Sequence, residues 1–125
     1  MYSKKVMQLF KNPKNVGEIK NADGYGKIRN PVCGDTTEVF IKVKDNKISG
    51  IKFKTLGCAA AISSASITTE MAKGRKLSDA EKLTKEKVVK QLGGLPENKI
   101  HCSVLAVDAL KEAIKDYKKR CLKAK

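Results

Sequence analysis

Between residues 37 and 56 the sequence alternates apolar or β-branched side chains with mostly charged ones, and this alternation limits the fold more than any other feature. Successive side chains of a strand point to opposite faces, so a period of two indicates half-buried strands. Asp45-Asn46-Lys47 interrupts the alternation with turn-forming residues. The pattern therefore predicts an antiparallel hairpin of residues 37–43 and 48–56 with one charged face toward water.

Helical signals precede and follow this hairpin. Ser3 is a good N-cap for a short helix to about Phe10, with Val6, Met7 and Phe10 as its apolar stripe. Asn12-Pro13 ends that helix. Turn-forming residues at 21–26 then lead into a short extended stretch that ends near Pro31.

The second half of the chain is predicted to be helical. Small residues after Gly57 predict a closely packed helix from 59 to about 73, which Gly74 ends. Shorter helices are expected at 77–81 and 84–92, the latter before Gly93-Gly94. The last helix begins near Cys102 or Ser103, and its apolar side is Val107, Leu110, Ile114 and Tyr117. Strands early and helices late predict an α+β fold with helices on one face of the sheet.

The 125 residues are enough for one domain, so we expect a single domain at 1–125. The chain shows neither a signal peptide nor an apolar run of membrane-spanning length, and we expect a cytoplasmic protein. The net charge of +14 suggests nucleic-acid binding. However, the lysines are scattered and lack an aromatic and arginine platform, which favours a solvated cationic surface or an acidic protein partner.

Three of the four cysteines occupy settings that suit a reactive or metal-binding thiolate. Cys33 lies in a loop with Gly34 and Asp35, whereas Cys58 and Cys102 lie at predicted helix starts. Unpaired N–H groups and the helix dipole there stabilise a thiolate, so both thiols are expected to ionise more readily than usual. In a reducing compartment such cysteines are ligands or reactive thiols more often than disulfides.

The site predicted from these thiols leaves several alternatives open. The three cysteines are far apart in sequence, unlike those of zinc ribbons or ferredoxins, and buried cysteines also serve as small hydrophobic residues. His101 or Asp35 could complete a tetrahedral set with them. Lys99 could pair with a thiolate or with Asp35. Cys121 falls in a lysine-rich tail that is expected to fray, and we expect no function for it.

Several motifs in order along the chain resemble the IscU/NifU-type iron-sulfur cluster assembly scaffold proteins. The matching stretches are Tyr2-Ser3, Asn12-Pro13-Lys14-Asn15-Val16-Gly17, Asn30-Pro31-Val32-Cys33-Gly34-Asp35, Lys52-Phe53-Lys54-Thr55-Leu56-Gly57-Cys58, Gly93-Gly94-Leu95-Pro96 and Lys99-Ile100-His101-Cys102-Ser103. The resemblance covers nearly the whole chain. It implies an IscU-like (SufE/NifU) α+β fold with a three-stranded antiparallel sheet.

The resemblance also implies a function and roles for individual residues. The protein would be a scaffold rather than an enzyme, building a 2Fe-2S cluster, or a 4Fe-4S cluster on a dimer, and passing it to apo-proteins. Cys33, Cys58 and Cys102 would be cluster ligands, with Asp35 or His101 as the fourth. Cys102 would also accept persulfide sulfur, and Asp35 would govern iron entry and cluster lability.

Partners and alternatives follow from the same resemblance. The implied partners are a cysteine desulfurase, apo iron-sulfur proteins, an iron donor and a reductant, with the scaffold as a monomer or homodimer. Tyr2 matches a tyrosine tied to dimerisation. Leu95-Pro96-Glu97-Asn98-Lys99 departs from the Leu-Pro-Pro-Val-Lys of members served by an Hsp70-type chaperone, so we do not expect that chaperone. Zn²⁺ can occupy the same site, and the alternative function is a structural zinc-binding domain.

Overall fold

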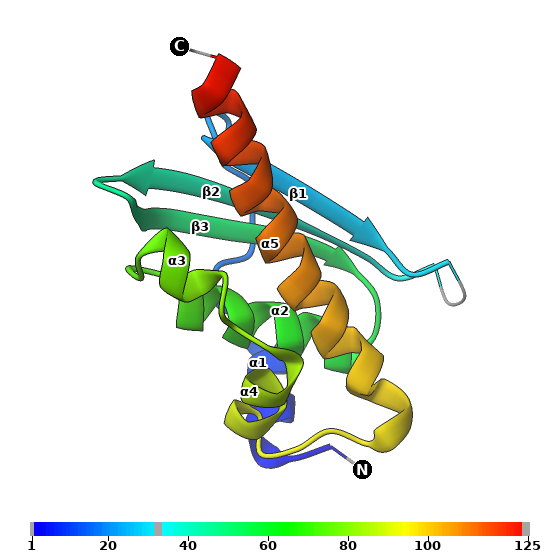
Figure 1. Cartoon of the computed structure of the whole chain (residues 1–125). Helices are drawn as coiled ribbons and strands as arrows, with labels where there is room; N and C mark the ends of the chain where they lie inside the picture. The colour runs from blue at the N-terminus through cyan, green and yellow to red at the C-terminus, as the bar shows by residue number, and fades with distance from the viewer. Residues whose placement is uncertain (1, 32–33, 124–125) are drawn as a thin grey trace.

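The computed structural model describes residues 2–31 and 34–123, and within them three strands form one antiparallel sheet in the order β1-β2-β3 (Figure 1). The strands are β1 (Gly24–Arg29), β2 (Thr36–Lys44) and β3 (Lys47–Leu56). The predicted hairpin of β2 and β3 is confirmed. Asp45 and Asn46 at its turn have positive φ angles of 53° and 63°, the conformation that favours a tight hairpin.

In the described residues the helical segments before and after the sheet are α1 (Lys4–Lys11), α2 (Ala59–Ala72), α3 (Leu77–Ala80), α4 (Lys85–Gln91), the 3-10 turn η1 (Glu97–Lys99) and α5 (Ile100–Lys123). α5 crosses one face of the sheet over β1 and β2, and α2 packs beside it against β3 (Figure 1). The inward side chains Val39 and Ile41 of the sheet join Leu110 and Ile114 of α5 in the main core. The predicted α+β architecture is therefore confirmed.

The contact between β1 and α5 depends on two glycines. A Cβ at Gly26 would lie 2.3 Å from the carbonyl oxygen of Ala109, and one at Gly24 would lie 2.3 Å from that of Ala113. Real Cβ atoms do not approach a carbonyl oxygen so closely, so no other residue fits these positions without moving the helix. The glycines therefore let the helix backbone rest directly on the strand.

The other face of the sheet is not entirely charged, contrary to the prediction. Phe40 is only 9% exposed, and its ring centroid lies 5.1 Å from that of Tyr25 on the neighbouring strand. Aromatic pairs at this separation stabilise cross-strand contacts. The Tyr25 hydroxyl also donates a hydrogen bond to Glu38.

The predicted apolar stripe of α1 is wrong in part. Ser3 caps the helix as expected, accepting a hydrogen bond from the Val6 amide. Val6 and Leu9 are buried, whereas Met7 and Phe10 are 36% and 42% exposed. The helix has apolar residues on two sides. Val6 and Leu9, three residues apart, form the side that packs on α2 and α4.

The last helix also differs from its prediction at both ends. It begins at Ile100, directly after η1, so His101 and Cys102 lie in its first turn. It continues to Lys123, so Cys121 lies within the helix rather than in a tail beyond it. Arg120 stabilises this end because it pairs with Asp116 and donates a hydrogen bond to the Ala22 carbonyl. Within the described part of the chain, no helix combines the length and apolar character needed to cross a membrane.

Candidate metal centre

Three potential metal ligands from distant parts of the sequence meet at one end of the sheet. Asp35 precedes β2, Cys58 is the N-cap of α2, and Cys102 lies in the first turn of α5. One carboxylate oxygen and the two sulfur atoms all lie within 4.8 Å of one another. This is close enough for a single ion or small cluster to contact all three.

Small residues allow this close approach. Gly57 follows β3, and a Cβ there would lie 3.0 Å from a carboxylate oxygen of Asp35 and 2.8 Å from the Cβ of Ala61. Ala60 and Ala61 are both buried and pack against Cys102. The alanines at the start of α2 therefore allow the first turns of α2 and α5 to pack closely. The missing side chain at Gly57 leaves space for the Asp35 carboxylate.

The thiols of Cys58 and Cys102 form a pair with different acidities. Their sulfur atoms are 3.8 Å apart. Burial acts to raise the pKa of Cys58, but the backbone N–H groups of Ala61 and Ala60, the Cys102 thiol and the Lys99 charge outweigh it, so this pKa is lowered. Burial and the negative charge of Cys58 raise the pKa of Cys102 to about 12.

The prediction that both thiols ionise readily is therefore correct for Cys58 and wrong for Cys102. Both occupy a helix start, but Cys102 is 1% exposed and its sulfur faces a second sulfur atom. Desolvation and like charge outweigh the helix dipole at this position. In the absence of metal, Cys58 therefore loses its proton at a lower pH than Cys102 does.

Two neighbouring side chains add polar groups to the pair. The Nε2 atom of His101 lies 3.7 Å from the Cys102 sulfur. The positive charge of Lys99 interacts with Cys58 first and with Tyr2, Cys102 and Asp35, and its own pKa is raised. Lys99 therefore acts on this group through its charge.

Tyr2 belongs to the site in a way that the sequence prediction missed. Its ring packs against the cluster formed by Cys102 and the alanines of α2, and its hydroxyl hydrogen-bonds to Cys58. Burial and the Cys58 charge raise the pKa of Tyr2. An aromatic residue just before a helix cap was the available signal, but nothing in the sequence placed it over the thiols.

Cys33, the remaining predicted ligand, lies outside the described residues. In the described backbone on either side of it, the Gly34 amide donates a hydrogen bond to the Asn30 carbonyl and the Asn30 amide donates one to the Asp35 carbonyl. Gly34 has a φ of 77°, which favours glycine. The placement of Cys33 as a ligand therefore stays a prediction.

The fold and this group of side chains define a class: α+β proteins in which two thiols at helix starts and a carboxylate before a strand could hold a metal ion. The chain belongs to the family described as the NifU-like N terminal domain, whose model matches residues 1–124. The family predicted from the sequence motifs is confirmed.

Curated relatives agree with this assignment. The chain is 58% identical over 117 residues to iron-sulfur cluster assembly scaffold protein IscU 1 of Archaeoglobus fulgidus, covering 94% of this chain and 76% of that protein. It is 46% identical over 123 residues to the protein named IscU of Buchnera aphidicola, covering 95% of each. These relatives are named as scaffolds, in agreement with the predicted scaffold or carrier.

Solved structures share the fold. A putative iron-sulfur cluster assembly scaffold protein for the SUF system from Fervidobacterium islandicum has a TM-score of 0.72 and 26% identity, covering 90% of this chain and 96% of that one. A NifU-like N-terminal protein of Brucella abortus has a TM-score of 0.73 at 18% identity, covering 94% of each chain, and shows the fold alone.

Proposed function

We propose that this protein is a scaffold on which iron and sulfide are assembled into a 2Fe-2S cluster that is then transferred to apo-proteins. The observation that carries the proposal is the meeting of Asp35, Cys58 and Cys102 within 4.8 Å. Thiolates are the usual ligands of such clusters, and a carboxylate is a weaker, more exchangeable ligand for iron in a soft site. A dimer of the scaffold would assemble a 4Fe-4S cluster as the larger product.

Iron binding starts at Cys58 in this proposal. Its lowered pKa makes it the first available thiolate, and Asp35 supplies a second negatively charged ligand. Cys102 joins when iron displaces its proton, since metal binding and thiol deprotonation are linked. Cys33 adds a third thiolate to the proposed ligand set, the fourth ligand is Asp35 or His101, and Zn²⁺ fits the same donors.

Sulfur enters at Cys102 in the same proposal. The Cys102 sulfur attacks the outer sulfur of a desulfurase persulfide, and the thiol proton of Cys102 passes to the donor cysteine, which leaves as a thiol while Cys102–S–SH forms. Two electrons from an external reductant then release sulfide and restore the Cys102 thiol. Because the Cys102 side chain is 1% exposed, this step requires Tyr2 or the first turn of α5 to move aside.

The proposal has further parts that concern the whole chain. Residues 1–125 act as one scaffold domain, with a desulfurase and apo iron-sulfur proteins as partners and an iron donor and reductant as suppliers. The thiols must stay reduced to bind iron, which suits a cytoplasmic location.

Anaerobic reconstitution with ferrous iron, cysteine and a cysteine desulfurase tests the function. The parent protein is expected to develop the visible absorption of a cluster. Separate substitution of Cys33, Cys58 and Cys102 by Ser should abolish these bands, whereas Cys121→Ser, on the distant end of α5, should retain them. Bound zinc that iron cannot displace, with no cluster bands in the parent, would favour the structural zinc domain instead.

The role of Asp35 in release is tested by cluster transfer. Because a carboxylate ligand exchanges more readily than a thiolate, Asp35→Ala is expected to hold its cluster and slow transfer to an apo-ferredoxin by about tenfold or more. Circular dichroism of the recipient's cluster follows the rate. Equal transfer rates for the variant and the parent would remove Asp35 from the mechanism.

A further inference from the structure

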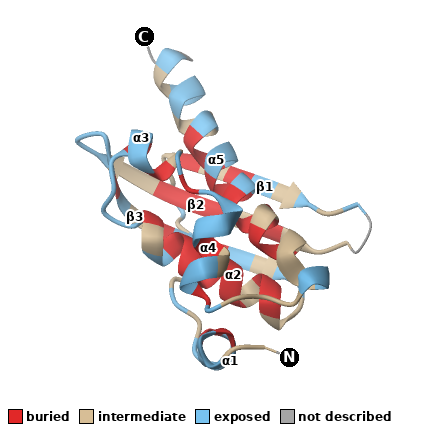
Figure 2. Ribbon diagram, turned by 60° about the horizontal axis from the view of Figure 1, so that its bottom comes forward, coloured by how far each residue is buried: buried red, intermediate tan, exposed pale blue. Residues whose placement is uncertain are grey.

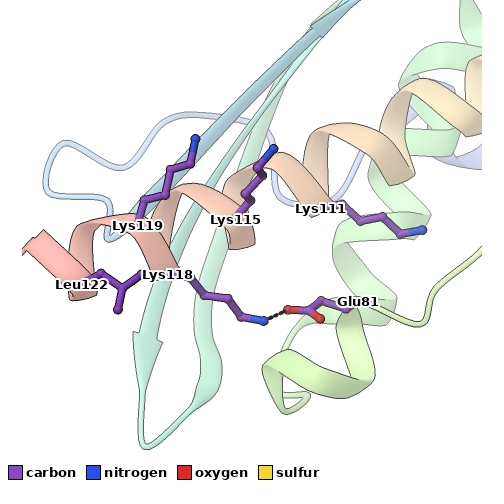
Figure 3. Close-up of a pocket in the computed structure, with 6 residues that line it drawn as sticks. All are labelled: Glu81, Lys111, Lys115, Lys118, Lys119 and Leu122. Atoms are coloured by element: carbon purple, nitrogen blue, oxygen red, sulfur yellow. Dashed lines mark hydrogen bonds and ion pairs between the residues drawn. The ribbon is translucent and has the colours of Figure 1, made fainter.

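A basic groove lies on the C-terminal half of α5, at the opposite end of that helix from the thiol pair. Its cavity of about 420 Å³ is lined by Glu81, Lys111, Lys115, Lys118, Lys119 and Leu122 (Figure 3). Lys118 reaches across to form an ion pair with Glu81. We refer to these six residues as the α5 basic groove.

The charge of this groove is unbalanced. Glu81 is the only carboxylate among its described lining residues, and it is already paired with Lys118. Lys111, Lys115 and Lys119 contribute positive charge to the same hollow without an opposing acid in it. A neighbouring hollow shares Lys111 and contains one further acid, Asp108, together with Lys85. The surface is therefore complementary to a partner with several carboxylates.

An apolar contact accompanies this charge. Leu122 is 74% exposed, and a second hollow that shares Leu122 and Lys118 is lined by Leu77 and Tyr117. Much of this part of α5 is exposed and extends beyond the sheet (Figures 1 and 2). Lys118 therefore lines both the charged hollow and the more apolar one.

The spacing along α5 indicates the shape of the occupant. Residues 111, 115, 118 and 122 lie on one face because 3.6 residues complete a turn. A partner helix laid along this face would place carboxylates and one apolar residue at the matching intervals. The described lining contains neither an arginine nor an aromatic stacking surface in the basic hollow, which disfavours nucleic acid.

We propose that the α5 basic groove binds an acidic amphipathic helix of a partner protein, with carboxylates against Lys111, Lys115 and Lys119 and an apolar side chain against Leu122. At 1.5 Å per residue, Lys118 lies about 24 Å along the helix from Cys102. A partner in the groove therefore leaves the thiol pair accessible to a second protein. The proposal does not depend on what the thiols bind.

A labelled synthetic helical peptide tests the groove on the full chain without iron. The probe carries glutamates at the spacing of the three lysines and one leucine for Leu122, and a second peptide has glutamine in place of each glutamate. The triple variant K111E/K115E/K119E should weaken binding of the acidic peptide by about tenfold or more. The matched control K5E/K11E/K20E changes the net charge equally at exposed positions elsewhere.

The outcomes separate a defined groove from general attraction. Fluorescence anisotropy should show that the control variant binds the acidic peptide within about twofold of the parent, and that L122S weakens binding several-fold. Equal weakening in both triple variants, or equal binding of the glutamine peptide, would overturn the proposal. Tighter binding of an RNA duplex or of phosphatidylserine vesicles at the same lysines would also overturn it.

Amide chemical shifts of the parent protein give a readout that needs no variant. Addition of the acidic peptide is expected to shift resonances of residues 111–122 and Glu81. Shifts confined to other parts of the chain would contradict the groove as the docking site.

Discussion

At the scale of single residues, the most informative contrast is between Cys58 and Cys102. Both occupy helix starts, yet the pKa of Cys58 is lowered and that of Cys102 is raised to about 12. The local sequence rule for helix N-termini holds for Cys58. It fails for Cys102 because burial and the second sulfur atom come from tertiary packing, which no local pattern contains.

This contrast predicts the pH dependence of alkylation in the metal-free protein. Only thiolates react with iodoacetamide, so Cys58 should be modified at pH values below 9.0, the ordinary thiol pKa. Cys102 should resist modification until the pH approaches 12, where its thiol begins to ionise. Peptide mass spectrometry after short exposures measures each site, and a Cys58→Ser variant tests the like-charge contribution by lowering the pKa of Cys102. Parallel rates at the two cysteines would contradict the assignment.

The candidate site as a whole was only partly accessible from the sequence. The sequence motifs pointed to Asp35, Cys58, His101 and Cys102, and the structure brings them together. The sequence did not indicate that Tyr2 packs over the thiols, because that contact depends on where the segment before α1 lies in the folded protein. Cys33 stays a prediction.

At the scale of elements, the β2–β3 hairpin and the longer helices could be predicted because their periodicity is local. The β1 strand could be predicted only as an extended stretch. Its glycines lower the strand propensity of this segment. They are needed because the α5 backbone packs directly on them. The buried face of α1 was also mispredicted because it depends on tertiary packing. Leu9, rather than Met7 or Phe10, packs on α2 and α4.

The contact between β1 and α5 predicts that Gly26→Ala is strongly destabilising. The new Cβ would lie 2.3 Å from the Ala109 carbonyl oxygen, so the helix must shift and the core beneath it must repack. We expect a loss of about 3 kcal/mol in the free energy of unfolding. Chemical denaturation followed by circular dichroism measures this value.

Gly50→Ala is the matched control in the same sheet. Its Cβ would meet only the Lys42 side chain, at 3.5 Å, which is ordinary contact. We expect a change within about 0.5 kcal/mol. Similar losses for the two variants would contradict the close approach of α5 as the reason for the glycine at position 26.

At the scale of the whole molecule, net charge is the dominant unbalanced property. The chain has 27 Lys and Arg residues against 13 Asp and Glu residues. The four ion pairs found among the described residues involve partly exposed side chains and contribute little. Mutual repulsion of the remaining lysines therefore opposes the folded state more than these pairs support it.

This balance predicts that salt stabilises the protein. Raising sodium chloride from about 0.01 M to about 0.15 M shortens the screening length from about 30 Å to about 8 Å. The free energy of unfolding should rise, as measured by urea denaturation at each salt concentration. The K5E/K11E/K20E variant should show a smaller rise, because it carries less repulsion to screen. A decrease with salt in the parent would mean that its ion pairs outweigh the repulsion.

The position of α5 in the chain has a consequence for synthesis on the ribosome. This helix covers β1 and β2 and supplies much of the main core, yet every strand is translated before it. Until the helix has left the exit tunnel, the apolar face of β1 and β2 has no cover, although α2 can already pack on β3. An uncovered sheet face is prone to aggregate, so a nascent chain that has not yet released α5 is expected to aggregate more readily than the chain with this helix in place.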